Sequence, residues 1–462
     1  MLSSTASLCP VCLKRIAAIR EQQGDAVYLL KRCPEHGTFR TVIWRGSVPF
    51  STWLRPKKAS TPRQAFTAVD RGCPFDCGLC PSHGQHTCTA LIEITNRCNL
   101  RCPVCFADAG EGEAQADVEP SLEQIGVLYD RVLAGSGPSN IQLSGGEPTM
   151  REDLAEIIRL GRSKGFDFIQ LNTNGIKLAA KSSYAQGLKE AGLSSVFLQF
   201  DGLSSATHLA LRGRDLRTIK EQAILNCGAA GLGVVLVPTL VPGINTAEVG
   251  AIVAYGACFA PTVRGVHFQP ISYFGRFPQA PADRDRLTLP EVVELIESQS
   301  KGSIRRDHFA PPACEHALCS FHGNFLVQED GSLIPLGSRT ACCSTGEPKE
   351  IPALEGRKKS VAFTARQWSC PPLPMASEAE RGCGCGDQPA PEDDFDRFLA
   401  RARTHTFSLS AMAFQDVWNL DLERLQGCCI HIVSPEGNLI PFCAYNLTSN
   451  QGAPLYRGVQ RA

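Results

Sequence analysis

The sequence predicts an α/β fold: a partial (β/α)6 TIM-like barrel with a small N-terminal metal-binding module and a cysteine-rich C-terminal domain. Three observations lead to this prediction. Short β-branched runs alternate with amphipathic stretches between residues 91 and 275, as is typical of βα units on a parallel sheet. Cysteine and histidine gather before residue 54, and the chain after residue 275 is irregular and rich in cysteine.

The barrel is expected to contain six βα units. We expect its strands at residues 89–95, 141–143, 168–171, 196–200, 234–240 and 266–269. We expect its helices at residues 121–134, 151–164, 182–191, 218–230 and 247–258, with Ser121 capping the first. Functional residues of such barrels lie at the carboxyl ends of the strands, so we expect the site there.

Around this core the sequence divides into further parts. Residues 1–54 form the expected Cys/His module, of zinc-ribbon or rubredoxin-like type, and residues 65–90 an expected auxiliary iron–sulfur segment. The expected core spans residues 91–275, and residues 276–462 form an expected C-terminal domain for auxiliary clusters and substrate.

Composition limits the function classes. Lys plus Arg and Asp plus Glu number 46 each, so charge gives no reason to expect nucleic acid or an anionic membrane surface as partner. The 22 cysteines recur at tight x2 and x3 spacings, which suit metal better than disulfides. The first residues do not resemble a signal peptide, and no apolar run approaches the roughly 18 to 20 residues of a membrane helix. We therefore expect a cytoplasmic enzyme with several metal sites.

One loop carries the strongest signal. Cys98, Cys102 and Cys105 follow the first expected strand at x3 and x2 spacing, so that their thiolates can converge on one 4Fe–4S cluster. Three ligands for four irons leave one iron open, and S-adenosyl-L-methionine can chelate it through its amino and carboxylate groups. A zinc loop is the alternative for these three residues taken alone.

The loop resembles the signature of the radical S-adenosylmethionine (radical SAM) family, except that Val104 stands where the family usually has an aromatic residue. The resemblance implies that the cluster is the catalytic group, and that it cleaves the cofactor to a 5′-deoxyadenosyl radical that abstracts hydrogen from an unactivated carbon. Later strand ends then match cofactor-binding positions: Gly145, Gly146, Glu147, Asn172, Asn174, Asp201 and Gln269. For Asn174, Asp201 and Gln269 a purely structural role at the strand end is the alternative.

Two further cysteine sets precede the barrel. Cys73, Cys77 and Cys80 repeat the x3 and x2 spacing, with Cys88 as a possible fourth ligand, and we expect a closed auxiliary 4Fe–4S cluster there. A second radical site and a zinc site are the alternatives. The N-terminal set is Cys9, Cys12, Cys33 and His36, which has the spacing of a site for zinc or mononuclear iron. His36 is either a ligand or a cap of its loop.

The C-terminal part offers more thiols than one cluster needs. Our first choices for a further auxiliary cluster are Cys314, Cys319 and Cys443. The other candidates are Cys342, Cys343, Cys370, Cys383, Cys385, Cys428 and Cys429, with one member of each adjacent pair expected to be a bystander. Cys227 and Cys258 lie on expected helices and are interpreted as buried packing residues.

The whole layout resembles the archaeal tetraether lipid synthase group, whose members were also described as hydroxymethyl-dihydropterin methyltransferases. The shared features include the CPEHG and SGGEPT segments and the ending from Ile440 to Leu447. The resemblance implies coupling of lipid alkyl chains, in a dry pocket that protects the radical. The alternatives are methylation of a pterin-like substrate, peptide maturation, and a non-enzymatic electron-transfer or scaffold role. The resemblance also implies a reducing partner such as ferredoxin or flavodoxin, and a lipid or small-molecule substrate. With a lipid substrate, the enzyme could be located at the periphery of a membrane.

Overall fold

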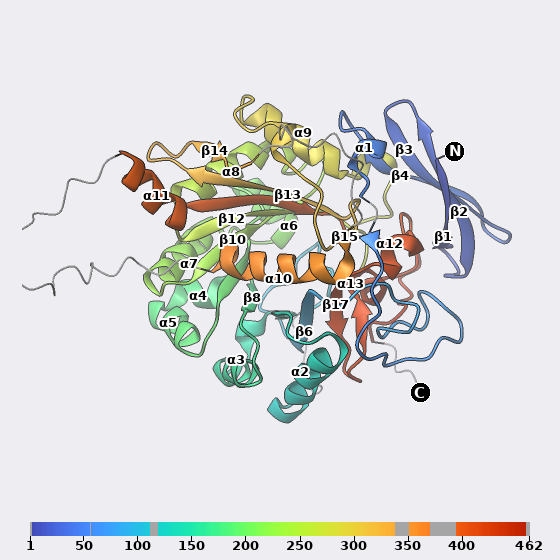
Figure 1. Cartoon of the computed structure of the whole chain (residues 1–462), viewed down its shortest axis with the longest axis horizontal. Helices are drawn as coiled ribbons and strands as arrows, with labels where there is room; N and C mark the ends of the chain where they lie inside the picture. Colours follow the sequence, from blue (N-terminus) through green and yellow to red (C-terminus); the bar gives the residue numbers. More distant parts are fainter. Residues whose placement is uncertain (1, 56, 111–118, 338–350, 370–393, 459–462) are drawn as a thin grey trace, which may run out of the picture.

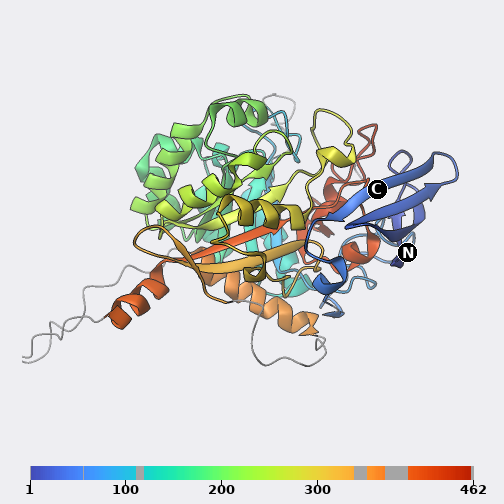
Figure 2. The same ribbon diagram turned by 90° about the horizontal axis from the view of Figure 1, so that it is seen from above.

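The computed structural model describes residues 2–55, 57–110, 119–337, 351–369 and 394–458. Its N-terminal part is a four-stranded antiparallel sheet in chain order, which lies at one end of the molecule in both views (Figures 1 and 2). The strands of this sheet are β1 (Ser3–Leu8), β2 (Arg15–Gln23), β3 (Ala26–Cys33) and β4 (Gly37–Arg45). A short helix, α1 (Phe50–Trp53), follows, and β5 (Lys57–Lys58) pairs with β15 (Ile351–Pro352).

The predicted parallel barrel strands are confirmed. Neighbouring strands pair in parallel and in chain order, so that each βα unit adds a strand beside the last. The six strands are β6 (Thr89–Thr95), β7 (Asn140–Gly145), β8 (Ile169–Thr173), β9 (Ser195–Gln199), β10 (Gly233–Val237) and β12 (Val263–Pro270). The run expected at 234–240 is divided at Pro238, which has no amide hydrogen to donate, and β11 (Thr239–Leu240) continues beside β12.

Helices cover the outside of this sheet (Figure 2). Ser121 caps the first of them through a capping box with Gln124, as predicted. The helices of the barrel are α2 (Leu122–Ser136), α3 (Leu154–Ser163), α4 (Ile176–Ala180), α5 (Ser182–Glu190), α6 (Ser205–Arg212), α7 (Arg217–Ala229) and α8 (Val249–Cys258). The sequence reading did not include the short helices α4 and α6. Cys227 is buried as expected, but the same expectation for Cys258 is wrong, because this thiol is exposed at the end of α8.

The C-terminal part extends the barrel sheet at both edges. At one edge β16 (Thr406–Met412) pairs in parallel with β12, and β13 (Ser320–Val327) and β14 (Leu333–Pro335) follow as antiparallel strands. At the other edge β17 (Ile430–Val433) pairs in parallel with β6, followed by β18 (Leu439–Pro441). The remaining helices are α9 (Leu289–Gln299), α10 (Ala353–Trp368), α11 (Asp394–Thr404), α12 (Leu422–Gln426) and α13 (Phe442–Asn446). One sheet therefore continues across residue 275, and the domain boundary there stays a prediction.

Helix α10 crosses the amino-terminal ends of the barrel strands (Figure 1). Near its start, Arg357 donates to the carbonyl oxygens of Thr87 and Pro138, which precede β6 and β7. Near its end, the carbonyl oxygen of Gln367 accepts from Arg264, at the beginning of β12. These contacts span the barrel from one side to the other, so α10 closes the end opposite to the cysteine loop.

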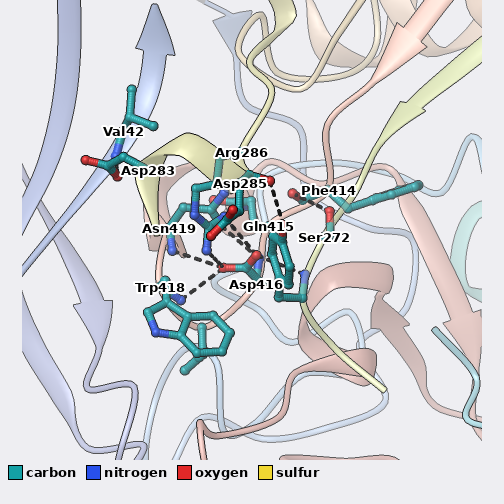
Figure 3. Close-up of polar contacts among 12 residues, drawn as sticks. Val42, Ser272, Asp283, Asp285, Arg286, Phe414, Gln415, Asp416, Trp418 and Asn419 are labelled. Atoms are coloured by element: carbon teal, nitrogen blue, oxygen red, sulfur yellow. Dashed lines mark hydrogen bonds and ion pairs between the residues drawn. The ribbon is translucent and has the colours of Figure 1, made fainter. Parts of the chain in front are cut away.

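A buried ion pair joins the segment after β12 to the C-terminal part (Figure 3). Arg286 donates to both carboxylate oxygens of Asp416 at 2.9 and 3.0 Å, and neither side chain is more than 6% exposed. The backbone amide of Trp418 also donates to Asp416. The N-terminal sheet is attached at the same place, because the amide of Val42 donates to Asp283. Among the described helices none is long and apolar enough to cross a bilayer.

Candidate active site

A cavity of about 510 Å³ fills the interior of the barrel. The cysteine loop lines it at the carboxyl ends of the strands, and Phe363 and Trp368 of α10 line it at the amino ends. Inward side chains of β7 to β12 and of β16 form its walls. Barrels of this kind are usually filled by side chains, so an open interior of this size is the place to look for cofactor and substrate.

The three thiols of the cysteine loop face this cavity. Cys98, Cys102 and Cys105 all line it, and they pack against the apolar Leu100 and Leu216. Burial raises the pKa of the Cys98 thiol to about 12 and also raises that of Cys102. Such thiols stay neutral at neutral pH unless a metal displaces their protons.

The loop is held in place from the segment after β12. Cys105 exchanges two backbone hydrogen bonds of 2.9 Å with Arg276, whose side chain donates to the carbonyl oxygen of Cys102. Gly275 is required here, because a Cβ atom at this position would lie 2.4 Å from the carbonyl oxygen of Phe106. The loop conformation therefore depends on the end of β12, about 170 residues away in the chain.

Two glycines bring the turn after β7 against the chain that leads into the cysteine loop. A Cβ atom added to Gly145 would lie 2.1 Å from the carbonyl oxygen of Thr95. A Cβ atom added to Gly146 would lie 2.3 Å from the carbonyl oxygen of Arg97. The amides of Gly146 and Glu147 donate to these same two carbonyl oxygens at 2.8 Å. Both glycines were expected at cofactor-binding positions, whereas the contact that the structure shows is between the two loops.

The carboxylate of Glu147 is occupied by protein donors. It accepts from the amide and hydroxyl of Thr149 at 3.1 and 2.6 Å, from the Thr173 hydroxyl at 2.7 Å and from the Asn174 amide at 2.7 Å. An ionised carboxylate offers about four acceptor positions, so this set uses its capacity. In this structure Glu147 connects the ends of β7 and β8, and its role as a cofactor-binding residue stays a prediction.

A buried ion pair supports the next part of the wall. Arg212 donates to both oxygens of Asp201 at 2.6 Å and to the carbonyl oxygen of Val104 in the cysteine loop at 3.1 Å. Burial alone would raise the pKa of Asp201, but the charge of Arg212 outweighs this and the pKa is lowered. Asp201 is fully buried behind Arg212, and Arg212 is the residue that lines the cavity.

The structure brings most of the predicted cofactor residues together. Gly145, Gly146, Glu147, Asn172, Asn174 and Gln269 line the same cavity as the three cysteines, and Asp201 contacts it through Arg212. Asn174 also donates to Asn99 of the cysteine loop at 2.7 Å. Sequence reasoning missed Arg212 and His267, because a single Arg at a helix end and a single His in a strand form no recognisable pattern.

The N-terminal thiols form a compact donor set. The ligand atoms of Cys9, Cys12, Cys33 and His36 lie within 4.8 Å of one another, at the turn before β2 and the turn between β3 and β4. Burial would raise the pKa of Cys33, but hydrogen bonds from His36 and from backbone amides lower it to about 6. A thiolate at neutral pH next to an imidazole is suited to a divalent metal.

A second compact set lies at the amino-terminal end of the barrel. Cys88 and Cys314 are joined by a disulfide, and the Cys429 thiol is within 4.8 Å of both. The Cα atoms of Cys88 and Cys314 are 7.4 Å apart, beyond the roughly 4.4 to 6.8 Å that is usual for disulfides. The three converging thiols therefore fit a metal site better than a single covalent bridge. Two cations, Lys57 and Arg357, and the acidic Glu315 interact electrostatically with Cys429 of this Cys88 triad.

This grouping differs from the ones expected from the sequence. Cys88 was expected with Cys73, Cys77 and Cys80, but it meets Cys429 because β17 pairs beside β6 and the Cys88 amide donates to the Cys429 carbonyl oxygen at 2.7 Å. Cys314 was expected with Cys319 and Cys443, which interact with Cys428 instead. The candidates Cys342, Cys343, Cys370, Cys383 and Cys385 lie outside the described residues.

Two segments of the chain match models of known protein families. Residues 1–45 match the family model of the HMPTM N-terminal zinc ribbon domain, and residues 92–255 match that of the radical SAM superfamily. The chain is 36% identical to a 7,8-dihydro-6-hydroxymethylpterin dimethyltransferase of Methanocaldococcus jannaschii, over 98% of this chain and 94% of the relative.

Two further similarities cover less of the chain. A GTP 3′,8-cyclase of Chlorobaculum tepidum is 30% identical over 60% of this chain and 84% of its own length. Among solved structures, Streptococcus suis SuiB aligns with 46% of this chain and 46% of its own, at 15% identity and a TM-score of 0.37.

Proposed function

This chain belongs to the radical SAM superfamily, and from that premise we propose that it is a methyltransferase that acts on a pterin-like substrate. One observation carries the proposal: the similarity to the 7,8-dihydro-6-hydroxymethylpterin dimethyltransferase extends over 98% of the chain. It therefore includes the zinc ribbon and the C-terminal strands as well as the barrel. This favours the methyltransferase alternative over lipid coupling, which the sequence alone placed first.

The residues of the cysteine loop fit a 4Fe–4S cluster. Cys98, Cys102 and Cys105 would hold three of its irons, since all three residues line the cavity and come from one loop. When bound, the cluster supplies the electron that cleaves S-adenosyl-L-methionine. Radical SAM enzymes need a reductant for this step, and ferredoxin or flavodoxin is the partner that we propose.

The chain itself orients and shields the reaction. Glu147 and Asn174 fix the ends of β7 and β8 against the cysteine loop, so that the backbone around the cofactor is set before it binds. Arg212 carries a buried positive charge beside Cys102, which stabilises thiolate at that position. At the other end, α10 closes the cavity and keeps water from a radical species.

The remaining thiol sets are proposed as supporting metal sites. The N-terminal set is a zinc site in this proposal, which the zinc-ribbon match supports over mononuclear iron. The Cys88 triad is an auxiliary iron–sulfur site at the end of the cavity opposite to the radical cluster. Cys73, Cys77 and Cys80 stay candidates for a further cluster; all three lie beside the end of α12.

Lipid coupling remains the second candidate. Apolar side chains such as Phe363, Met412 and Phe414 line parts of the cavity and would suit an alkyl chain. Against it stands the polar lining on the inward faces of β7, β8 and β16, where a chain of methylene groups would leave amides and hydroxyls unpaired.

The test compares substrates on one preparation. Anaerobically purified protein is reduced with dithionite and given S-adenosyl-L-methionine with 7,8-dihydro-6-hydroxymethylpterin, a total lipid extract, or neither. Mass spectrometry then follows 5′-deoxyadenosine and methylated pterin. We expect methylated pterin only with the pterin, with a second molecule of S-adenosyl-L-methionine as the methyl source, S-adenosyl-L-homocysteine as its product and dithionite as the electron source, and none from Cys102→Ala. Cofactor cleavage that lipid stimulates and pterin does not would replace the proposal by lipid coupling.

A further inference from the structure

The middle of the barrel cavity carries polar and aromatic side chains that the cofactor end does not use. Inward positions of such barrels are mostly occupied by Val, Ile and Leu. Here the wall includes amides, hydroxyls and a cluster of His267 with aromatic rings: Gln142, Asn172, Phe197, His267, Trp368, Ser408 and Ser410. A pocket lined in this way has both a flat apolar surface and groups that can read hydrogen bonds.

Three rings form the flat surface. The ring centroids of Phe197 and Trp368 are 5.4 Å apart, those of Phe197 and His267 are 5.3 Å apart, and those of His267 and Trp368 are 5.9 Å apart. They come from β9, β12 and α10, so this aromatic face is built where α10 meets the sheet. Trp368 is held there by its indole N–H, which donates to the Ser408 hydroxyl at 3.2 Å. Offset or edge contacts between rings at such distances are favourable, and a further ring can join them.

His267 presents a nitrogen to the cavity from this face. Its Nδ1 is 2.8 Å from the Ser410 hydroxyl, so that hydrogen bond leaves the other ring nitrogen, Nε2, for a ligand in the cavity that His267 lines. Burial lowers the pKa of His267 to about 4, so the ring is neutral near pH 7. Two cations of α10 lie at this end of the cavity: Lys359 lines it and is paired with Glu355, and Arg357 is buried against the carbonyl oxygens of Thr87 and Pro138. A neutral imidazole offers either a donor or an acceptor at Nε2, depending on its tautomer.

Asn172 provides a second polar group next to the rings. It lies opposite Phe197 in the β8–β9 register and lines the cavity. Its Oδ1 is buried without a partner among the described residues, and its Nδ2 is 3.4 Å from Gln142 Oε1, which is a long contact. A buried acceptor without a donor is unfavourable, and a ligand N–H in the cavity would satisfy it.

We propose that the aromatic face, His267 Nε2 and the Asn172 amide together bind the planar, nitrogen-rich ring of the substrate. This inference rests on the proposed function and names the subsite for the ring. The ring would stack on the aromatic face, while its N–H, ring nitrogen and carbonyl groups pair with His267 and Asn172. Asn172 then serves the substrate, and not the cofactor as its strand-end position suggested. A saturated chain would offer neither stacking nor hydrogen bonds, so the subsite also selects against lipid.

The test measures binding of 7,8-dihydro-6-hydroxymethylpterin to the cluster-loaded enzyme by anaerobic calorimetry. His267→Phe keeps a ring but removes both nitrogens, and we expect at least tenfold weaker binding. His267→Gln places an amide near the Nε2 position and should restore most of the affinity. Asn172→Leu keeps the volume without the amide and should also weaken binding at least tenfold. The control is Trp418→Phe, since Trp418 packs on Tyr273 outside the cavity walls.

The outcomes separate this inference from the proposed function. Wild-type enzyme that neither binds nor methylates the pterin overturns both. Wild-type enzyme that binds it, with His267→Phe and Asn172→Leu binding equally well, overturns the subsite alone. If His267→Gln is as weak as His267→Phe while Trp418→Phe is normal, Nε2 is not the contact. Binding of S-adenosyl-L-methionine, measured for each variant, shows whether the cavity is still formed.

Discussion

Replacement of Gly146 by alanine tests how the cysteine loop is positioned. The added Cβ atom would lie 2.3 Å from the carbonyl oxygen of Arg97 and 2.8 Å from that of Asn96, and ordinary contact begins near 3.4 Å. Both neighbours are backbone, so the two loops must separate by about 1 Å. Overpacking of this kind costs roughly 1 to 3 kcal/mol of stability. A shift of about 1 Å at reacting groups lowers rates by roughly a hundredfold.

The assay follows 5′-deoxyadenosine formation together with iron content after anaerobic reconstitution. We expect Gly146→Ala to form 5′-deoxyadenosine about a hundredfold more slowly and to keep its zinc, because the N-terminal set is remote from this turn. The matched control is Gly187→Ala in α5, where nothing lies within 4 Å of the new Cβ atom. That variant should be slightly more stable, since alanine favours helix over glycine. Full iron content and normal cleavage in Gly146→Ala would refute the argument from loop contact.

Three further predictions follow from the described contacts. Cys429→Ser should lower the iron content of the protein and leave the electron paramagnetic resonance signal of the radical cluster unchanged. Cys258→Ser, at an exposed thiol, should change neither quantity. Equal iron content in the two variants would contradict an auxiliary site at Cys429. Arg212→Gln leaves Asp201 as a buried unpaired charge and should cost about 3 to 5 kcal/mol in urea unfolding, with Arg217→Gln, whose ion pair is exposed, as the control that changes little. The folded-state pKa of His267 is about 4, below its unfolded value of 6.5, so as pH falls the unfolded chain takes up the proton first. Stability should then be lost from about pH 6.5 down to pH 4, and that part of the loss should be missing in His267→Gln; identical pH profiles would contradict it.

The parts of the fold that local pattern determines could be predicted from the sequence. The strand β6 was expected with its observed bounds, and Ser121 was expected as a cap, because β-branched runs and capping residues act over a few positions. The strands β16 and β17 were not expected at the edges of the barrel. Nothing local to residues 406–412 or 430–433 indicates that they pair with β12 and β6, since that pairing depends on contacts more than a hundred residues apart.

The same distinction explains the metal sites. Cys98, Cys102 and Cys105 share one loop, so their spacing alone predicted that they would face one place, and all three do line the cavity. The Cys88 triad comes from three distant segments, and spacing placed its members in different groups. One signal was present: Cys88 and Cys429 each directly precede a β-branched or apolar run, and parallel neighbouring strands bring such positions together.

The choice between substrates depends on residues that the motifs do not include. Both the lipid and the pterin reading use the same cysteine loop and the same turn after β7, so these motifs cannot decide between them. The inward face of the barrel can distinguish the two substrates. Polar groups that are placed to form hydrogen bonds with a ligand are left unpaired when an apolar ligand binds. Among the described residues Asn172 already has an acceptor without a partner, and His267 lines the cavity beside two aromatic rings, with its Nδ1 and not its Nε2 on Ser410. An alkyl chain would leave both unpaired, whereas a pterin ring would pair with both, so the polar middle of the cavity favours the ring.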